Sequence, residues 1–268
     1  MSSNLYIVPF DFSPVSEKAL EYAIHLGKHV ETEIKILHLS KDKNIGITKA
    51  KLLEAVKTNT KVPAGVKLTT LVEVGSIFKD IGKIAAKEKA QLVIMGTHGL
   101  SGGQWLFGSF AMKVLRSADC PFLIVQKSTK IEEIEKIVIP IDLTKESMQI
   151  VNIAGDMSNI MNAKITVLAE KQTDQILNQR IQNRIGIIKK QYDEREIETN
   201  IHFVKNTRDY RKKIMQYVNE NDIGLIALSY HSESLFPQFD TFAQKLITNK
   251  PALPVLIINS KLASALYY

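Results

Sequence analysis

The chain has 268 residues, a formal net charge of +7 and a single cysteine. At roughly 100–200 residues per domain this length allows one to three domains, and a hydrophobic fraction of 45% is that of a globular protein with cores of ordinary size. One cysteine excludes an internal disulfide framework and fits a reducing cytoplasm, and the apolar runs are far shorter than the roughly 20 residues of a membrane-spanning helix.

The positive charge is unevenly distributed along the chain. Residues 1–130 contain 18 Lys and Arg against 11 Asp and Glu, whereas residues 131–268 contain 17 of each. The excess consists mostly of single lysines spaced along expected helices, with few arginines and no interleaved aromatic residues. Nucleic-acid surfaces gather such charge into patches, so we expect no nucleic-acid partner, and we expect no membrane partner.

Apolar strand patterns alternate with amphipathic helix patterns through the first half of the chain. Short apolar runs predict five strands, at residues 5–10, 34–39, 68–74, 92–95 and 122–125. Helical spacing predicts four helices. The first begins at Ser13-Pro14, the second covers 42–58, the third contains Ile77, Ile81, Ile84 and Ala85, and the fourth covers 109–117. Strands that alternate with helices are typical of a parallel sheet with helices on both faces.

The second half repeats this order of elements about 131–133 residues later. The matching segments are 137–142 with 6–11, 165–168 with 34–37, and 253–258 with 120–125. A repeat of this length is a whole domain rather than a solenoid unit. We therefore predict two tandem α/β domains, 1–128 and 131–260, each with a five-stranded, mainly parallel open sheet. The charged segment 170–200 is expected to be largely helical.

The segment after the fourth strand differs between the two halves. Residues 92–98 read Leu-Val-Ile-Met-Gly-Thr-His, and residues 225–231 read Leu-Ile-Ala-Leu-Ser-Tyr-His. The first copy then supplies Gly99, a Gly-Gly pair and Gly108, whereas the second continues without a glycine. Glycine-rich turns let backbone N–H groups approach a phosphate, so only the first half is expected to hold an anion.

Three features of the first half converge on one edge of its expected sheet. Asp11 ends the first strand, the turn from Gly96 to Gly99 ends the fourth, and Gly108-Ser109 opens the next helix. In open parallel sheets, ligands bind at the carboxyl ends of the strands where the strand order reverses. Asp11 offers an acceptor for an adenine amino group or a ribose hydroxyl. A plain alternative is that the glycines make tight turns while Asp11 and Ser109 cap helices.

These segments resemble the universal stress protein family. Asp11-Phe-Ser-Pro with the helix after it is similar to the family's opening strand and helix, and Gly96-Thr-His-Gly99 with Gly108-Ser109 and residues 120–125 is similar to its closing segment. The likeness extends over the whole chain, once per half. It implies an adenine-hydrolase-like fold, and two domains paired through their last strands as an intramolecular pseudo-dimer. A further homodimer is left open. It also implies a cytoplasmic stress-response role with an unknown protein partner.

Family members that bind ATP carry the pattern G-x2-G-x9-G-[ST]. The resemblance implies an ATP site in the first domain, with Mg²⁺ on the phosphates and backbone contacts from Leu39 to adenine. The implied site residues are Asp11, Leu39, Gly96, Gly99, Gly108 and Ser109. Eight residues, rather than nine, separate Gly99 from Gly108. One missing residue shifts backbone donors by up to about 3.5 Å, which favours a nucleotide-free adaptor of the same fold instead.

The second half keeps Asp142 but has other residues where glycines would stand, namely Ser229, Ser232 and Asp240. Asp240 would bring a negative charge to the position of a phosphate, and Pro237 removes a backbone N–H donor. We therefore expect no nucleotide in the second domain.

Enzymatic alternatives are a slow ATPase, autophosphorylation at Ser109 and a related adenine hydrolase. The Ser101-Gly102-Gly103 string resembles a pyrophosphatase loop, but it follows the fourth strand rather than the first, and His98 is the candidate base nearby. We therefore expect a regulatory protein rather than an enzyme, without catalytic residues or a metal bound by side chains. Gly96→Val and Gly108→Val are each expected to abolish nucleotide binding and to leave the fold largely intact.

Overall fold

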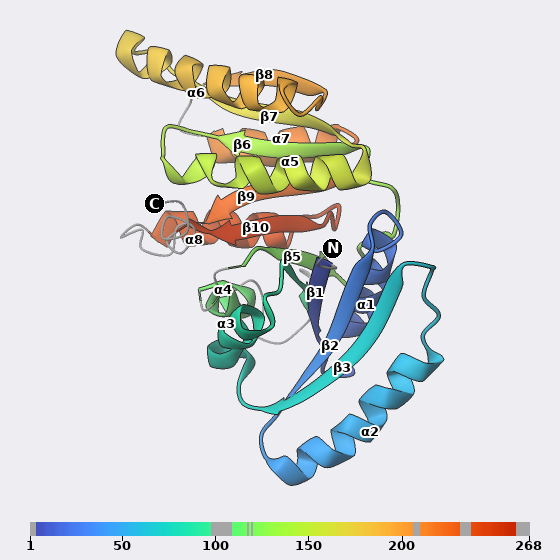
Figure 1. Cartoon of the computed structure of the whole chain (residues 1–268). Coiled ribbons are helices and arrows are strands. Elements are labelled where there is room, and N and C mark those ends of the chain that lie inside the picture. Colours follow the sequence, from blue (N-terminus) through green and yellow to red (C-terminus); the bar gives the residue numbers. More distant parts are fainter. Residues whose placement is uncertain are drawn as a thin grey trace. The chain divides into compact units, whose positions relative to one another are not determined.

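The computed structural model describes residues 4–97, 109–116, 118, 120–205, 210–230 and 237–260. Contacts between residues divide the chain into two compact units, Met1–Ile131 and Glu132–Tyr268, which we call the first and second units. Each unit is an α/β fold built on five parallel strands with intervening helices, so the predicted fold class is confirmed (Figure 1). The pairing of the two units as a pseudo-dimer stays a prediction.

Strands and helices alternate throughout the first unit. Its elements are β1 (Asn4–Pro9), α1 (Pro14–Leu26), β2 (Thr32–Ser40), α2 (Lys43–Asn59), β3 (Val66–Val74), α3 (Ile77–Glu88), β4 (Leu92–Thr97), α4 (Ser109–Leu115) and β5 (Phe122–Gln126). The strand order within the unit is β3-β2-β1-β4-β5, and neighbouring strands in it are parallel. Ile7 and Val8 of the central strand β1 are fully buried. The apolar runs therefore predicted the strands correctly, with most ends shifted by one or two residues.

The strand order of the first unit reverses between β1 and β4. The chain runs outward through β1, β2 and β3, and then returns across the sheet to β4 and β5. Right-handed crossovers put α1 and α2 on one face of such a sheet and α3 and α4 on the other. In agreement, α1 packs against β1, β4 and β5, while α3 and α4 contact each other (Figure 1). The diverging connections leave room for a ligand at the carboxyl ends of β1 and β4.

The second unit repeats the arrangement. Its elements are β6 (Lys136–Ile141), α5 (Ile150–Met161), β7 (Lys164–Lys171), α6 (Gln175–Asp193), β8 (Thr199–Lys205), α7 (Tyr210–Glu220), β9 (Leu225–Tyr230), α8 (Pro237–Ile247) and β10 (Val255–Asn259). The strand order within the unit is β10-β9-β6-β7-β8, again parallel. The charged segment 170–200 is largely the helix α6, as predicted.

The strand registers of the two units match residue by residue. Pro9 of β1 lies opposite Leu37 of β2, and Pro140 of β6 lies opposite Leu168 of β7. Residues at the ends of these strands can therefore be compared directly between the units.

Among the described residues, none of the helices is both long enough and apolar enough to cross a bilayer.

Candidate functional site

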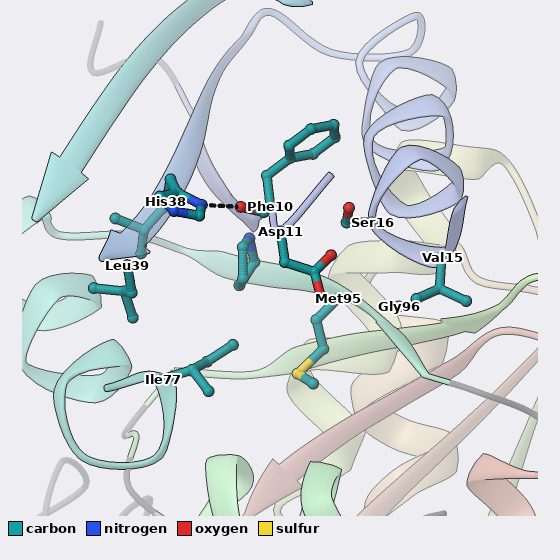
Figure 2. Close-up of a pocket in the computed structure, with 11 residues that line it drawn as sticks. Phe10, Asp11, Val15, Ser16, His38, Leu39, Ile77, Met95 and Gly96 are labelled. Atoms are coloured by element: carbon teal, nitrogen blue, oxygen red, sulfur yellow. Dashed lines mark hydrogen bonds between the residues drawn. The ribbon is translucent and has the colours of Figure 1, made fainter. Parts of the chain in front are cut away.

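A cavity of about 190 Å³ lies at the carboxyl ends of β1, β2 and β4 of the first unit, where the strand order reverses (Figure 2). Its walls come from these strand ends, from the first turn of α1 and from the first residue of α3. Most of the lining is apolar, with Val15, Leu37, Ile77 and Met95 among the lining residues. A cavity with apolar walls and a few polar groups at a strand-order reversal is the usual form of a small-molecule site in this class of fold.

The structure brings together three of the six residues predicted for the site. Asp11 after β1, Leu39 on β2 and Gly96 on β4 all line the cavity (Figure 2). Gly99 and Gly108 lie outside the described residues. Ser109 is the first residue of α4, and its side chain is likewise outside what the structure describes.

Of the 11 residues that line the cavity, eight were not among the predicted site residues, and His38 and Ile77 are the most informative of them. His38 is 9% exposed and lies on β2, within the predicted strand 34–39, where the apolar pattern indicates a buried strand and no binding residue. Ile77 begins α3 directly after Ser76, whose hydroxyl accepts the N–H of Phe78 as a helix cap. The apolar pattern predicts Ile77 on this helix, and the capping serine before it is the signal that could have placed it at the helix start, near a strand end.

A tight turn at the end of β1 presents Asp11. The Oδ1 atom of this exposed residue accepts hydrogen bonds from the Ser13 backbone N–H at 3.0 Å and from the Ser13 hydroxyl at 2.5 Å. Ser13 in turn caps α1 by accepting the N–H of Ser16. Burial alone would raise the pKa of the Asp11 carboxyl, but the hydrogen bonds from Ser13 and Ser16 outweigh burial and hold this pKa below its ordinary value of 3.8. The carboxylate is therefore ionised at neutral pH and available as an acceptor.

The lowered pKa of Asp11 predicts how the Asp11→Asn variant depends on pH. A carboxyl whose pKa is lower in the folded state stabilises the fold above its unfolded pKa, and this contribution is lost as the pH falls through the folded value. We expect Asp11→Asn to lower the free energy of unfolding by about 1 kcal/mol at neutral pH, because solvent weakens hydrogen bonds of an exposed group. The difference between the variant and the parent should shrink as the pH falls below 3.8 and through the lower pKa of the folded state. Urea unfolding at neutral pH and at a series of acidic pH values measures this difference.

Asp222→Asn is the matched control for this series, because Asp222 is exposed and lies outside the helices and strands, between α7 and β9. This variant should follow the parent protein at every pH. An Asp11→Asn effect that is the same size at acidic and neutral pH would contradict the role given to the Asp11 charge.

The residue after Asp11 holds an uncommon backbone conformation. Phe12 has a φ of 67°, in the left-handed region that bulky residues rarely adopt. Its ring packs against Phe10 and His38 with centroid separations of 5.3 Å, and the Nζ atom of Lys49 lies 4.5 Å from its centroid. His38 is fixed as well, because its Nδ1 donates to the Phe10 carbonyl at 2.7 Å. These contacts hold the turn that presents Asp11.

Gly96 has a structural role that the sequence analysis did not foresee. A Cβ atom added there would lie 2.2 Å from the carbonyl oxygen of Val15 and 2.6 Å from its carbonyl carbon. Both are backbone atoms of the first turn of α1, which cannot easily move away. The expectation that Gly96→Val would leave the fold largely intact is therefore wrong. Gly108, named in the same expectation, lies outside the described residues.

The second unit has the same turn at the matching place. Asp142 Oδ1 accepts the backbone N–H of Thr144 at 2.9 Å and the Thr144 hydroxyl at 2.5 Å. In addition, Arg184 donates to the carbonyl oxygens of Asp142, at 2.8 Å, and of Thr144. Beside this turn, the hydroxyl of Tyr210 lies within hydrogen-bond distance of the carbonyl oxygens of Ile141, the last residue of β6, and of Leu168 within β7. Side chains of the second unit thus bond backbone carbonyls at the place that matches the cavity of the first.

The described lining of the cavity contains few ionisable side chains. Within the part of the chain that the structure describes, the ionisable side chains lining it are Asp11 and His38. His38 already uses Nδ1 on a backbone carbonyl, and no second carboxylate, lysine or cysteine of the described lining could complete an acid–base pair. The cavity can enclose a flat apolar group whose polar edge meets Asp11.

Comparison with known proteins places the first unit in a family. The family model described as the universal stress protein family matches residues 6–126. A universal stress protein of Methanocaldococcus jannaschii is 32% identical over 146 residues, which cover 47% of this chain and 86% of that protein. A universal stress protein of Bacillus subtilis is 29% identical over 147 residues, which cover 46% of this chain and 99% of that protein.

A solved structure resembles the chain over both units. The crystal structure of a universal stress protein from Archaeoglobus fulgidus matches with a TM-score of 0.76 and 18% sequence identity, covering 97% of this chain and all of that one. At this identity the match establishes the shared fold.

Proposed function

Because this chain belongs to the universal stress protein family, we propose that its first unit binds ATP in the cavity beside Asp11 and that the protein is a stress-response regulator rather than an enzyme. The observation that carries the proposal is the meeting of Asp11, Leu39 and Gly96 around one cavity at the reversal of strand order. These three residues come from separate strand ends and were chosen from the sequence as nucleotide contacts. A cytoplasmic location accords with the single cysteine.

Different residues of the cavity suit the base and the ribose of a nucleoside. Its apolar walls suit a purine base, with the backbone of Leu39 at the edge of β2 as partner for the base's polar atoms. The ionised Asp11 carboxylate can accept from an amino group or a ribose hydroxyl. By the family pattern, Gly99, Gly108 and Ser109 would contact the phosphates, and Mg²⁺ would be held mainly by phosphate oxygens, as is common for this ion.

The shortened glycine spacing supports a second candidate, a nucleotide-free adaptor that works through a protein partner. Only eight residues separate Gly99 from Gly108, where the ATP-binding pattern has nine, and the missing residue shifts the backbone N–H donors relative to the phosphates. In this candidate function the cavity no longer binds a nucleotide, and the protein acts by binding its protein partner.

Titration calorimetry of nucleotide-stripped protein separates these two functions. We expect ATP with Mg²⁺ to bind at one site with micromolar affinity and to raise the melting temperature, and we expect AMP to bind more weakly. Asp11→Ala should weaken ATP binding about tenfold, since a hydrogen bond to a charged group contributes about 1.5–3 kcal/mol. Asp222→Ala, at an exposed position in the second unit, is the control and should bind as the parent does. No heat and no thermal shift with ATP would favour the adaptor.

A further inference from the structure

Tyr210 reaches from a helix to two neighbouring strands of the second unit. It is the first residue of α7, and its hydroxyl lies 3.1 Å from the carbonyl oxygen of Ile141 and 2.7 Å from that of Leu168. Ile141 is the last residue of β6, and Leu168 lies within β7, opposite Pro140 of β6. The tyrosine side chain therefore crosses the space between the start of α7 and these two strands.

The corresponding space in the first unit is the cavity. Ile77 begins α3 as Tyr210 begins α7, and each helix follows the third strand of its unit. Ile77 lines the cavity and has no polar atom with which to bond a strand end (Figure 2). One helix position thus decides whether a side chain crosses this space or leaves it open.

The partner of the strand-end carbonyl changes together with that helix position. The matching registers make Phe10 the counterpart of Ile141, and His38 the counterpart of Ala169. In the first unit, His38 donates to the Phe10 carbonyl from the adjacent strand. Ala169 has no donor in its side chain, so in the second unit the donor comes from across the space, from Tyr210.

The surroundings of Tyr210 keep its hydroxyl protonated. Burial raises the pKa of this group well above 10, and the carboxylates of Asp142 and Glu170 raise it further. The hydroxyl is therefore a permanent donor, but it has one hydrogen for two carbonyls.

We propose that Tyr210 is the built-in occupant of the second unit's ligand site, and that this site, once vacated, accepts a flat heterocycle bearing an amino group. An amino group has two hydrogens and can bond the carbonyls of Ile141 and Leu168 together, which one hydroxyl cannot. An oxo group in place of the amino group has no hydrogen to donate, so its oxygen would face two carbonyl oxygens without a hydrogen bond. The proposal rests on the proposed function, because it assigns the second unit the same base site as the first.

The test is to replace Tyr210 with the residue of the first unit and to titrate the full chain with adenine. We expect Tyr210→Ile to lower the melting temperature by about 5–10 °C, because a half-buried ring and its hydrogen bonds are lost. The variant should bind adenine at one more site than the parent does. Adenine should also restore part of the melting temperature that the variant has lost. Hypoxanthine, which carries an oxo group instead of the amino group, should do neither.

Two control variants separate a ligand site from an ordinary cavity. Tyr192 is fully buried in the second unit, and its hydroxyl donates to the Val151 carbonyl at 2.8 Å. Tyr192→Ile should lose stability without gaining an adenine site. Tyr210→Phe keeps the ring and removes the donor, so it should lose less stability and remain closed to adenine.

An unchanged number of adenine sites in Tyr210→Ile, or equal binding of hypoxanthine, would overturn the proposal. If Tyr210→Ile does not fold, Tyr210→Phe decides: a lower melting temperature supports the proposal, and the parent's melting temperature overturns it. The number of adenine sites is counted relative to the parent, so this proposal and the proposed ATP site of the first unit are tested separately. If the parent binds no ATP, the proposed function is wrong, but an adenine site added by Tyr210→Ile can still be measured.

Discussion

Replacing Ile77 with tyrosine is expected to abolish ATP binding by the first unit while leaving its fold intact. The new ring would occupy the cavity from the same helix position that Tyr210 holds in the second unit. Ile77 is half-buried at a helix start, so the larger side chain can enter the cavity without displacing a packed core. Loss of the base contacts should weaken ATP at least about 100-fold in titration calorimetry, equivalent to about 3 kcal/mol.

Two further variants make this result specific. Ile47→Tyr adds the same side chain on α2, where Ile47 is 63% exposed and does not line the cavity, and should bind ATP normally. The double variant Ile77→Tyr with His38→Ala copies the second unit's donor arrangement, and should recover any stability that Ile77→Tyr alone loses. Binding of ATP by Ile77→Tyr with the parent's affinity would show that the nucleotide site lies elsewhere.

Gly96→Ala is expected to destabilise the first unit strongly, whatever its effect on ligands. The added methyl group would lie 2.2 Å from a backbone oxygen of Val15, so α1 and β4 would have to move apart. Forced overpacking of this kind costs about 3 kcal/mol, which urea unfolding would detect readily. Nucleotide binding by this variant therefore cannot be interpreted without its stability.

Gly186→Ala provides the matched control for this substitution. Gly186 lies within α6, and a Cβ atom there would meet nothing within 4 Å. Alanine favours the helical state over glycine by about 0.5–1 kcal/mol, so this variant should be slightly more stable than the parent. Equal stability losses in the two alanine variants would refute the close approach of α1 to Gly96.

Local sequence patterns predicted the fold because each element carries its own signal. Ser13 and Pro14 mark the start of α1 through a capping hydroxyl and a fixed φ, and the structure has the helix begin there. The carboxyl ends of parallel strands meet at one edge, which is why Asp11 and Gly96 could be grouped from their places in the sequence, whereas Leu39 was added by the family resemblance.

The sequence could not predict the long-range contacts that determine whether a residue has a structural role or a binding role. A glycine that lets a phosphate approach and a glycine that lets a helix approach look alike, and only the distance to Val15 separates them for Gly96. Tyr210 is similar: its partners Ile141 and Leu168 are 69 and 42 residues away along the chain. Nothing in the residues around Tyr210 indicates that it would cross a site.

The paired aspartate turns bear on how a duplicated protein evolves. Asp11 and Asp142 each accept from a hydroxyl residue two positions later, and that residue, Ser13 or Thr144, also accepts an N–H of the following turn. Selection for folding alone is enough to retain such a turn in both copies. An aspartate at this position is therefore a poor marker of a working site in a tandem protein. The residue that begins the third helix of each copy is the more informative one to read.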